Sequence, residues 1–151
     1  MDKETNIRIR YTNHYPAELG YICNDKSDWI DLYTAEDVTL KSGEFRLISL
    51  GIAMSLPNGV EAHIAPRSST FKNYGVLQAN GVGIIDSSYR GDNDIWKFPA
   101  FATRDVTIPK GTRLCQFRLY HTMQQEFGQV KFEPVLTLGN VDRGGFGSTG
   151  K

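Results

Sequence analysis

Apolar and polar residues alternate along most of this chain, and that period of two constrains its fold more than any other feature. The alternation is clearest in three stretches: Ile7, Ile9 and Tyr11; Ile48, Leu50, Ile52, Met54 and Leu56; and Cys115, Phe117 and Leu119. Successive side chains of a strand point to opposite faces, so the pattern predicts half-buried β-strands. Turn signals such as Pro57-Asn58-Gly59 separate them at short intervals. Because many short strands must close or double their sheets to hide edges, we expect an all-β sandwich or barrel of the jelly-roll type.

The segment Ser69–Tyr74 is the one stretch that we expect to be helical. Ser68 or Ser69 can cap its first turn, and Gly75 can take the left-handed conformation that ends a helix. The predicted fold class is therefore a jelly-roll β-barrel with one short helix.

Length and charge limit the classes of function. The 151 residues suit one domain. Seventeen Lys and Arg balance seventeen Asp and Glu, so we expect no nucleic-acid partner and no membrane surface partner. The N-terminus lacks the apolar region of a signal peptide and no apolar run is long enough to span a membrane, which predicts a cytoplasmic protein. Cys23 and Cys115 lack metal-ligand spacing, and we expect buried free thiols.

The C-terminal segment is rich in glycine. Gly145 to Lys151 match the phosphate-loop pattern G-x-x-x-x-G-K, but the strand before and the helix after that such a loop requires are missing. Ordering these glycines costs backbone entropy, and apolar content falls from Leu138 onward. We therefore expect residues 1–137 to form the domain and residues 138–151 to form a flexible arm that closes over an active site.

The first candidate site is Pro66-Arg67-Ser68-Ser69-Thr70, which joins an expected strand to the short helix. A helix N-terminus carries unpaired N–H groups and a partial positive charge, and one guanidinium and two hydroxyls add donors for phosphate oxygens. The alternative is a capped helix with Arg67 in a surface salt bridge.

The second candidate site runs from Asn80 to Asp92. Two glycines let the backbone approach a flat ligand, and Asn80 offers the donor and the acceptor of an amide. Asp86 follows two large apolar residues and can act as a general base if a water lies within reach. The alternative is a β-turn in which Asp86 bonds its own backbone. Tyr89 can stack on a ring or pack at the edge of the core.

Two single residues extend these sites. Asp31 lies between apolar neighbours, and one such carboxylate suffices for a magnesium ion that phosphates already chelate, although Asp31 equally suits a strand edge. Gln116 points opposite Cys115 and Phe117 in the alternating pattern, so it can face a cleft.

Taken in order, these segments resemble the five motifs of the trimeric deoxyuridine triphosphatases (dUTPases), which extend over almost the whole chain. The matching segments are Asp28–Asp37, Pro66–Thr70, Gly83–Asp92, Arg113–Phe117 and Arg143–Gly150. Trp29-Ile30 departs from the residues that commonly precede the Asp of the first motif. The stretch Asn93–Phe101 is more similar to bacteriophage and prophage members than to most cellular ones, which implies the host cytoplasm as its location.

The resemblance implies a jelly-roll homotrimer whose active sites are shared between subunits. Its reaction would be hydrolysis of dUTP to dUMP and pyrophosphate by attack of water on the α-phosphorus with Mg²⁺, keeping uracil out of DNA and supplying dUMP for thymidylate synthesis. By position, Asp86 is similar to the catalytic base, and Asp31 to the acid that holds magnesium through water. The implied phosphate contacts are Arg67, Ser68, Ser69, Gln116, Arg143, Gly147, Ser148 and Thr149. The implied contacts to uracil and deoxyribose are Asn80, Gly83, Ile85, Tyr89 and Phe146. Phe146 would cover the base from an arm that another subunit donates.

Two other functions fit parts of this pattern. A dCTP deaminase shares the fold and a similar Arg-Ser-Ser motif, but it needs a Glu placed for proton transfer at the cytosine amino group, and the arm with Phe146 favours the dUTPase. The other alternative is a regulatory protein that keeps the scaffold and binds a protein partner.

Overall fold

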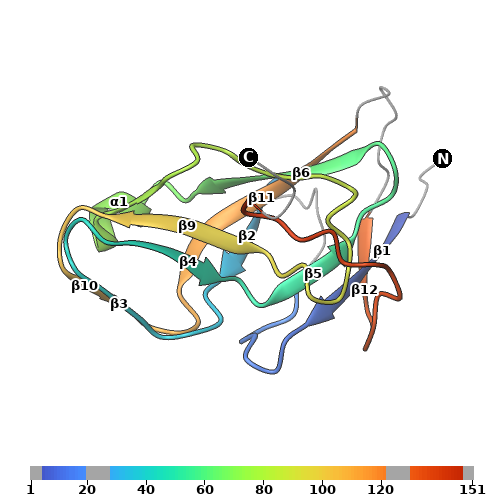
Figure 1. The fold of residues 1–151 in the computed structure, drawn as a ribbon, viewed down its shortest axis with the longest axis horizontal. Coiled ribbons are helices and arrows are strands. Elements are labelled where there is room, and N and C mark those ends of the chain that lie inside the picture. The colour runs from blue at the N-terminus through green and yellow to red at the C-terminus, as the bar shows by residue number, and fades with distance from the viewer. Residues whose placement is uncertain (1–4, 20–27, 122–129, 148–151) are drawn as a thin grey trace.

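A computed structural model of the chain describes residues 5–19, 28–121 and 130–147 (Figure 1). The described part is nearly all β with one short helix, which confirms the predicted fold class. The elements are β1 (Thr5–Tyr11), β2 (Ile30–Tyr33), β3 (Val38–Leu40), β4 (Phe45–Ser49), β5 (Ile52–Ser55), β6 (Val60–Pro66), α1 (Thr70–Tyr74), β7 (Val76–Gln78), β8 (Gly83–Ile85), β9 (Lys97–Ala102), β10 (Val106–Ile108), β11 (Arg113–His121) and β12 (Val130–Pro134).

The described strands form four sheets around one core. Their strand orders are β12-β1-β5, β10-β3, β2-β11-β6-β8 and β4-β9-β7. Figure 1 shows α1 and the β3–β10 pair at one end of the long axis, with β1 and β12 at the other. The rings of Trp96 and Phe117 meet edge to face at 5.3 Å, and Phe117 meets Phe132 at 6.0 Å. These contacts join residues of three different sheets or their flanking loops, so a single core holds the sheets together.

The predicted alternation is confirmed in two of its three stretches. Ile7 and Ile9 are fully buried in β1, and Gln116 lies between the buried Cys115 and Phe117 in β11. The stretch from Ile48 to Leu56 is instead two strands, β4 and β5, which belong to different sheets. The chain turns between them at Gly51, which has φ 71°, so a continuous apolar pattern runs around a corner of the barrel.

The short helix begins and ends close to its predicted positions. Gly75 has φ 65° and its N–H donates to the carbonyl of Phe71, as expected for a glycine after a helix. Ser69 occupies the N-cap position but makes no side-chain capping bond, because its φ of −94° and ψ of −5° are helical rather than extended. The buried Thr70 hydroxyl donates to the Leu114 carbonyl at 2.6 Å and thereby ties the helix to β11.

The expectation of buried free thiols is met for the one cysteine that lies within the described residues. Cys115 is a buried free thiol, as predicted, whereas Cys23 lies outside the described residues. None of the described helical segments is long and apolar enough to cross a membrane.

Candidate active site

Several of the predicted phosphate-binding residues meet at one end of the β2-β11-β6-β8 sheet. The strand register places Gln116 of β11 opposite Asp31 of β2. Arg67, directly after β6, has its Nε 3.1 Å from Asp31 Oδ1, and Arg113 has its Nη1 3.7 Å from Asp31 Oδ2. The Gln116 amide donates to the Pro66 carbonyl at 3.2 Å. We call Asp31, Arg67, Arg113 and Gln116 the arginine cluster.

The arginine cluster suits an anion. Two guanidinium groups flank one carboxylate, so a positive charge remains, and all three side chains are about one third to one half exposed. Ser68 is exposed beside the cluster, and the Ser69 hydroxyl is not used for capping. Arg113 was recognised in the sequence only as part of the fourth motif and was not predicted to contact phosphate. The alternating pattern of β11 does not indicate that its side chain reaches Asp31.

Asp31 is the residue expected to contact magnesium through water. Among residues 5–19, 28–121 and 130–147 there is no group of three or more His, Cys, Asp or Glu that could hold a metal ion. Both oxygens of Asp31 already face guanidinium groups. Mg²⁺ is usually bound by one or two carboxylates together with substrate phosphates and waters. Asp31 therefore fits an ion that arrives with phosphates, and does not fit one that the protein holds alone.

A second group of predicted residues surrounds a cavity of about 200 Å³ next to the turn at which the chain passes from β7 to β8, strands of two different sheets. We call it the hairpin cavity. Its lining residues are Asn80, Ile84, Ile85, Asp86, Tyr89, Arg143, Gly145 and Phe146. The structure thus brings together most residues that were expected to contact uracil and deoxyribose, with Gly83 close by in β8. Ile84 was not predicted to contribute; it is 62% exposed because it is on the outer side of β8.

Aromatic packing closes one side of the hairpin cavity. The Tyr89 hydroxyl donates to the Ile95 carbonyl at 2.8 Å, and burial raises the pKa of Tyr89 to about 12. Its ring meets the Phe146 ring edge to face at 6.4 Å. A Cβ on Gly145 would lie 2.9 Å from the Tyr89 ring, so only glycine allows this close approach.

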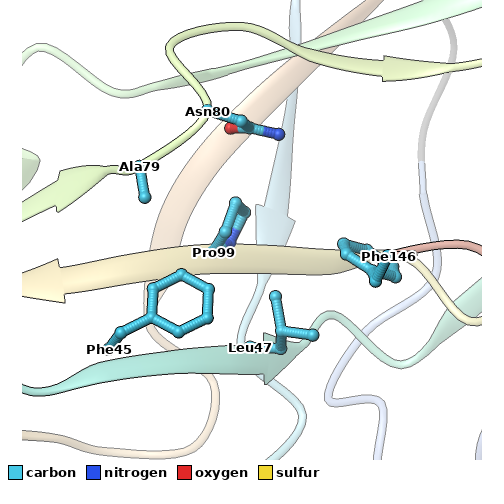
Figure 2. A pocket seen from close by; sticks show the side chains of 6 residues that line it. All are labelled: Phe45, Leu47, Ala79, Asn80, Pro99 and Phe146. Atoms are coloured by element: carbon cyan, nitrogen blue, oxygen red, sulfur yellow. The ribbon is translucent and has the colours of Figure 1, made fainter. Parts of the chain in front are cut away.

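Phe146 is held between two cavities. The second cavity, of about 330 Å³, is lined by Phe45, Leu47, Ala79, Asn80, Pro99 and Phe146 (Figure 2). Asn80 and Phe146 line both cavities and so form the wall between them. Phe146 has φ 56°, a left-handed conformation that costs a non-glycine residue about 1–2 kcal/mol. The Lys97 ammonium lies 5.4 Å from the ring centre and helps to hold it.

Asp86 is both a turn residue and a cavity residue. The Ser88 hydroxyl and the Ser88 N–H, at 3.2 Å, donate to Asp86 Oδ2, and the Tyr89 N–H donates to the Asp86 carbonyl. The Ser88 hydrogen bonds are the largest cause of a lowered pKa for Asp86; burial opposes them, and the positive charge of Arg143 adds a smaller lowering effect. Asp86 therefore does bond within a β-turn, as the alternative interpretation expected. Its carboxylate is nevertheless exposed and ionised at neutral pH.

The arginine cluster and Asp86 lie at opposite ends of β6. Ile85 pairs with Ala62, so Asp86 follows at the level of Glu61, whereas Arg67 comes directly after Pro66. From Glu61 to Arg67 the strand advances by six residues, which is about 20 Å at roughly 3.3 Å per residue. This separation is several times the distance over which a side chain contacts a phosphate. One chain therefore does not bring Asp86 and Arg67 to the same triphosphate.

Most of the described C-terminal segment is held by hydrogen bonds to its own chain. Asp94 is 1% exposed and accepts N–H donors from Gly91 at 2.9 Å, Arg143 at 2.8 Å and Gly144 at 2.9 Å. Upstream, Asp92 accepts bonds from the Thr137 hydroxyl and the Leu138 N–H.

From this segment, Arg143, Gly145 and Phe146 line the hairpin cavity of the same chain. Donation of the arm to another subunit stays a prediction. Ser148 and Thr149 lie outside the described residues, and Gly147 is exposed. The sequence did not single out Asp94, because its partners are about fifty positions away in the chain.

Comparison with known proteins identifies the family. The family model described as dUTPase matches residues 25–150. The chain belongs to the dUTPase family. It is 52% identical over 144 residues to the SPbeta prophage-derived deoxyuridine 5'-triphosphate nucleotidohydrolase of Bacillus subtilis, covering 95% of this chain and 97% of that relative.

Two solved phage structures share the fold at low sequence identity. A mutant dUTPase from phage phi11 of S. aureus, described with a structural Mg(II) ion, has a TM-score of 0.65 at 18% identity and covers 83% of this chain and 96% of its own. A mutant dUTPase of Staphylococcus bacteriophage 80alpha with dUpNHpp has a TM-score of 0.65 at 16% identity, with the same coverage. The latter is described as one of the phage dUTPases that control transfer of virulence genes.

Asp94→Ala should release the C-terminal segment, because the Arg143 and Gly144 N–H groups lose their acceptor. We expect trypsin to cleave after Arg143 about tenfold faster or more than in the wild type. Mass spectrometry of the released peptide measures the rate. Asp105→Ala is the matched control, because Asp105 accepts one backbone N–H from Ser42 at the far end of the molecule. Equal cleavage rates in wild type and Asp94→Ala would contradict the account.

Proposed function

We propose that this protein hydrolyses dUTP to dUMP and pyrophosphate, as the name of its B. subtilis relative describes for that protein. The observation that carries the proposal is an ionised carboxylate, Asp86, at the edge of a cavity lined by Asn80, Tyr89 and Phe146. Such a cavity suits a planar base and a sugar, and it places their phosphate beside the carboxylate. The prophage origin of that relative supports a phage-encoded enzyme acting in the host cytoplasm.

Asp86 acts as the general base in this proposal. It accepts a proton from a water molecule, and the water oxygen attacks the α-phosphorus while the bond to the bridging oxygen of pyrophosphate breaks. Ser88 holds the carboxylate in its ionised form and fixes its orientation. Arg143, exposed beside Asp86, adds positive charge next to the phosphates.

The arginine cluster binds the phosphates. Arg67 and Gln116, with the hydroxyls of Ser68 and Ser69, donate hydrogen bonds to their oxygens. Mg²⁺ bound with the triphosphate would neutralise phosphate charge, and Asp31 is the described carboxylate placed to contact its water shell. When phosphates enter, Arg67 has to share its guanidinium between Asp31 and the new anion.

The hairpin cavity selects the nucleoside. Asn80 and the Gly83 backbone face the uracil ring, beside Ile85. Tyr89, whose hydroxyl is held by Ile95, packs under deoxyribose where a ribose 2′-hydroxyl would collide. Phe146 covers the base, and residues 138–151 form the closing arm, with Gly147, Ser148 and Thr149 reaching the β- and γ-phosphates. Closure excludes water and fixes the triphosphate for attack.

A complete site then requires more than one subunit. The separation of about 20 Å along β6 means that the base Asp86 of one chain must work with the arginine cluster of another. An exposed apolar row supports a subunit interface: Phe45, Phe101 and Leu77 are direct cross-strand neighbours on β4, β9 and β7 and are 54%, 39% and 47% exposed. We propose a homotrimer that shares its active sites in this way.

Asp86→Asn tests the proposed reaction. The amide cannot accept the proton, so pyrophosphate release from dUTP should fall about 10²- to 10⁴-fold while binding of a non-hydrolysable dUTP analogue persists. Asp105→Asn, remote from both clusters, should keep full activity. Ammonia release from dCTP, or hydrolysis that survives Asp86→Asn, would contradict the proposal. A regulatory role, which the description of the 80alpha relative favours for that protein, would survive the substitution.

Ser88→Ala tests whether the Ser88 hydrogen bonds keep Asp86 ionised. The variant loses the hydroxyl donor that lowers the pKa of Asp86, so that pKa rises. A general base works above its pKa, so activity is lost as pH falls, and in Ser88→Ala this loss should begin at higher pH than in the wild type. The pH profile of kcat/KM measures the shift. Ser42→Ala removes an exposed hydroxyl far from Asp86 and should leave the profile unchanged.

A further inference from the structure

Gln78, the last residue of β7, is buried beneath the base-binding hairpin. It is 8% exposed, and its side-chain nitrogen Nε2 lies 2.9 Å from the Ile64 carbonyl and 3.0 Å from Asn80 Oδ1. A backbone carbonyl only accepts hydrogen bonds, so Ile64 fixes which end of the Gln78 amide is the nitrogen. The second N–H of that nitrogen then points at Asn80.

The orientation of Asn80 follows from this contact. Its oxygen Oδ1 accepts from Gln78, so its own nitrogen Nδ2, with two N–H donors, faces away from Gln78. Figure 2 shows that nitrogen directed to the side of the cavity where Phe146 lies. Gly83 lies close to this amide, because a Cβ added at position 83 would be 3.4 Å from Gln78 Nε2 and 3.7 Å from Asn80 Nδ2.

The remaining atom of Gln78 makes a purely structural role a poor explanation. Its oxygen Oε1 is buried and has no hydrogen-bond partner among the residues that the structure describes. A buried acceptor without a donor is unfavourable, and a methionine or leucine would fill the same space without it. What glutamine supplies and those residues do not is a pair of N–H donors, one to the Ile64 carbonyl and one to Asn80 Oδ1, and the second of these reaches the amide that lines the cavity.

We infer that Gln78 is a specificity-determining positioning residue, which holds Asn80 with its N–H donors toward the base and so selects a base with a carbonyl oxygen, rather than an amino group, at ring position 4. This rests on the proposed function. Uracil presents that oxygen as an acceptor, whereas cytosine presents an amino donor that would face the Asn80 donors. Each donor left unpaired in a closed site lowers binding by about ten- to a hundredfold.

Gln78→Met tests the inference, because methionine has a similar length and no amide. Freed from Gln78, Asn80 can turn either its oxygen or its nitrogen toward the base. The ratio of kcat/KM for dUTP to that for dCTP should fall about tenfold or more, with kcat for dUTP at saturation changed less than KM. Thr103→Val is the matched control. It removes a hydrogen bond of 2.6 Å to the Gly75 carbonyl at the other end of β7, and its ratio should equal that of the wild type.

Binding measurements separate this inference from the proposed reaction. Calorimetry of dUMP and dCMP reports base preference even if the wild type hydrolyses neither triphosphate, in which case the proposed function alone fails. A folded Gln78→Met with the wild-type preference overturns the role of Gln78, as does a wild type with no preference. If Gln78→Met does not fold, Asn80→Asp serves instead. Gln78 would donate to one carboxylate oxygen and leave the other facing the base, so preference should move toward dCMP, and an unchanged preference overturns the inference.

Discussion

The pairing of β6 with its two neighbours is the constraint on which the rest of the site depends. All seven residues of β6 pair with β11, and its middle residues also pair with β8. The first pairing places Gln116 and the β2 carboxylate Asp31 next to the end of β6, where Arg67 follows. The second places Asp86, which follows β8, toward the opposite end. A shift of one residue in either register would turn these side chains to the other face of the sheet.

The loop between β8 and β9 organises the other half of the site. Asp92 and Asp94 use their carboxylates to bind backbone N–H groups of the C-terminal segment, and the same loop supplies the Ile95 carbonyl that holds Tyr89. Because Asp94 is buried and its donors are backbone groups, the position of Phe146 depends on main-chain geometry more than on its own side-chain contacts. Contacts within its own chain therefore position the described C-terminal segment up to Gly144.

Local features of the fold could be predicted from the sequence because neighbouring residues encode them. The alternation in β1 and β11, and the short helix that Gly75 ends, are of this kind. Four of the five residues expected around a base, Asn80, Gly83, Ile85 and Tyr89, are likewise close in the chain, and all of these except Gly83 line one cavity together with the distant Phe146. The break at Gly51 was missed because both strands bury their apolar residues in the same core, so the pattern continues through the corner.

Other features depend on contacts between distant positions. Asp94 binds Arg143 and Gly144, and Gln78 acts through Ile64 and Asn80, so neither has a local signature. The ion pairs of Asp31 with Arg67 and Arg113 likewise join three separate strands or their ends. The separation of Asp86 from Arg67 along β6 also depends on strand register, which the sequence does not reveal. The sequence therefore indicated both groups of residues, but it did not indicate that they lie about 20 Å apart in one chain.

The central claim is that the general base and the arginine cluster of one active site come from different chains. It is tested most directly by mixing two inactive variants, Asp86→Asn and Arg67→Ala, through co-expression with different tags and purification of the mixed oligomers. If sites are shared, the purified mixed trimers should recover about one third of the wild-type dUTP hydrolysis, because one of the three sites in each mixed trimer pairs an intact Asp86 with an intact Arg67. Mixed oligomers that remain as inactive as either variant alone would contradict the account.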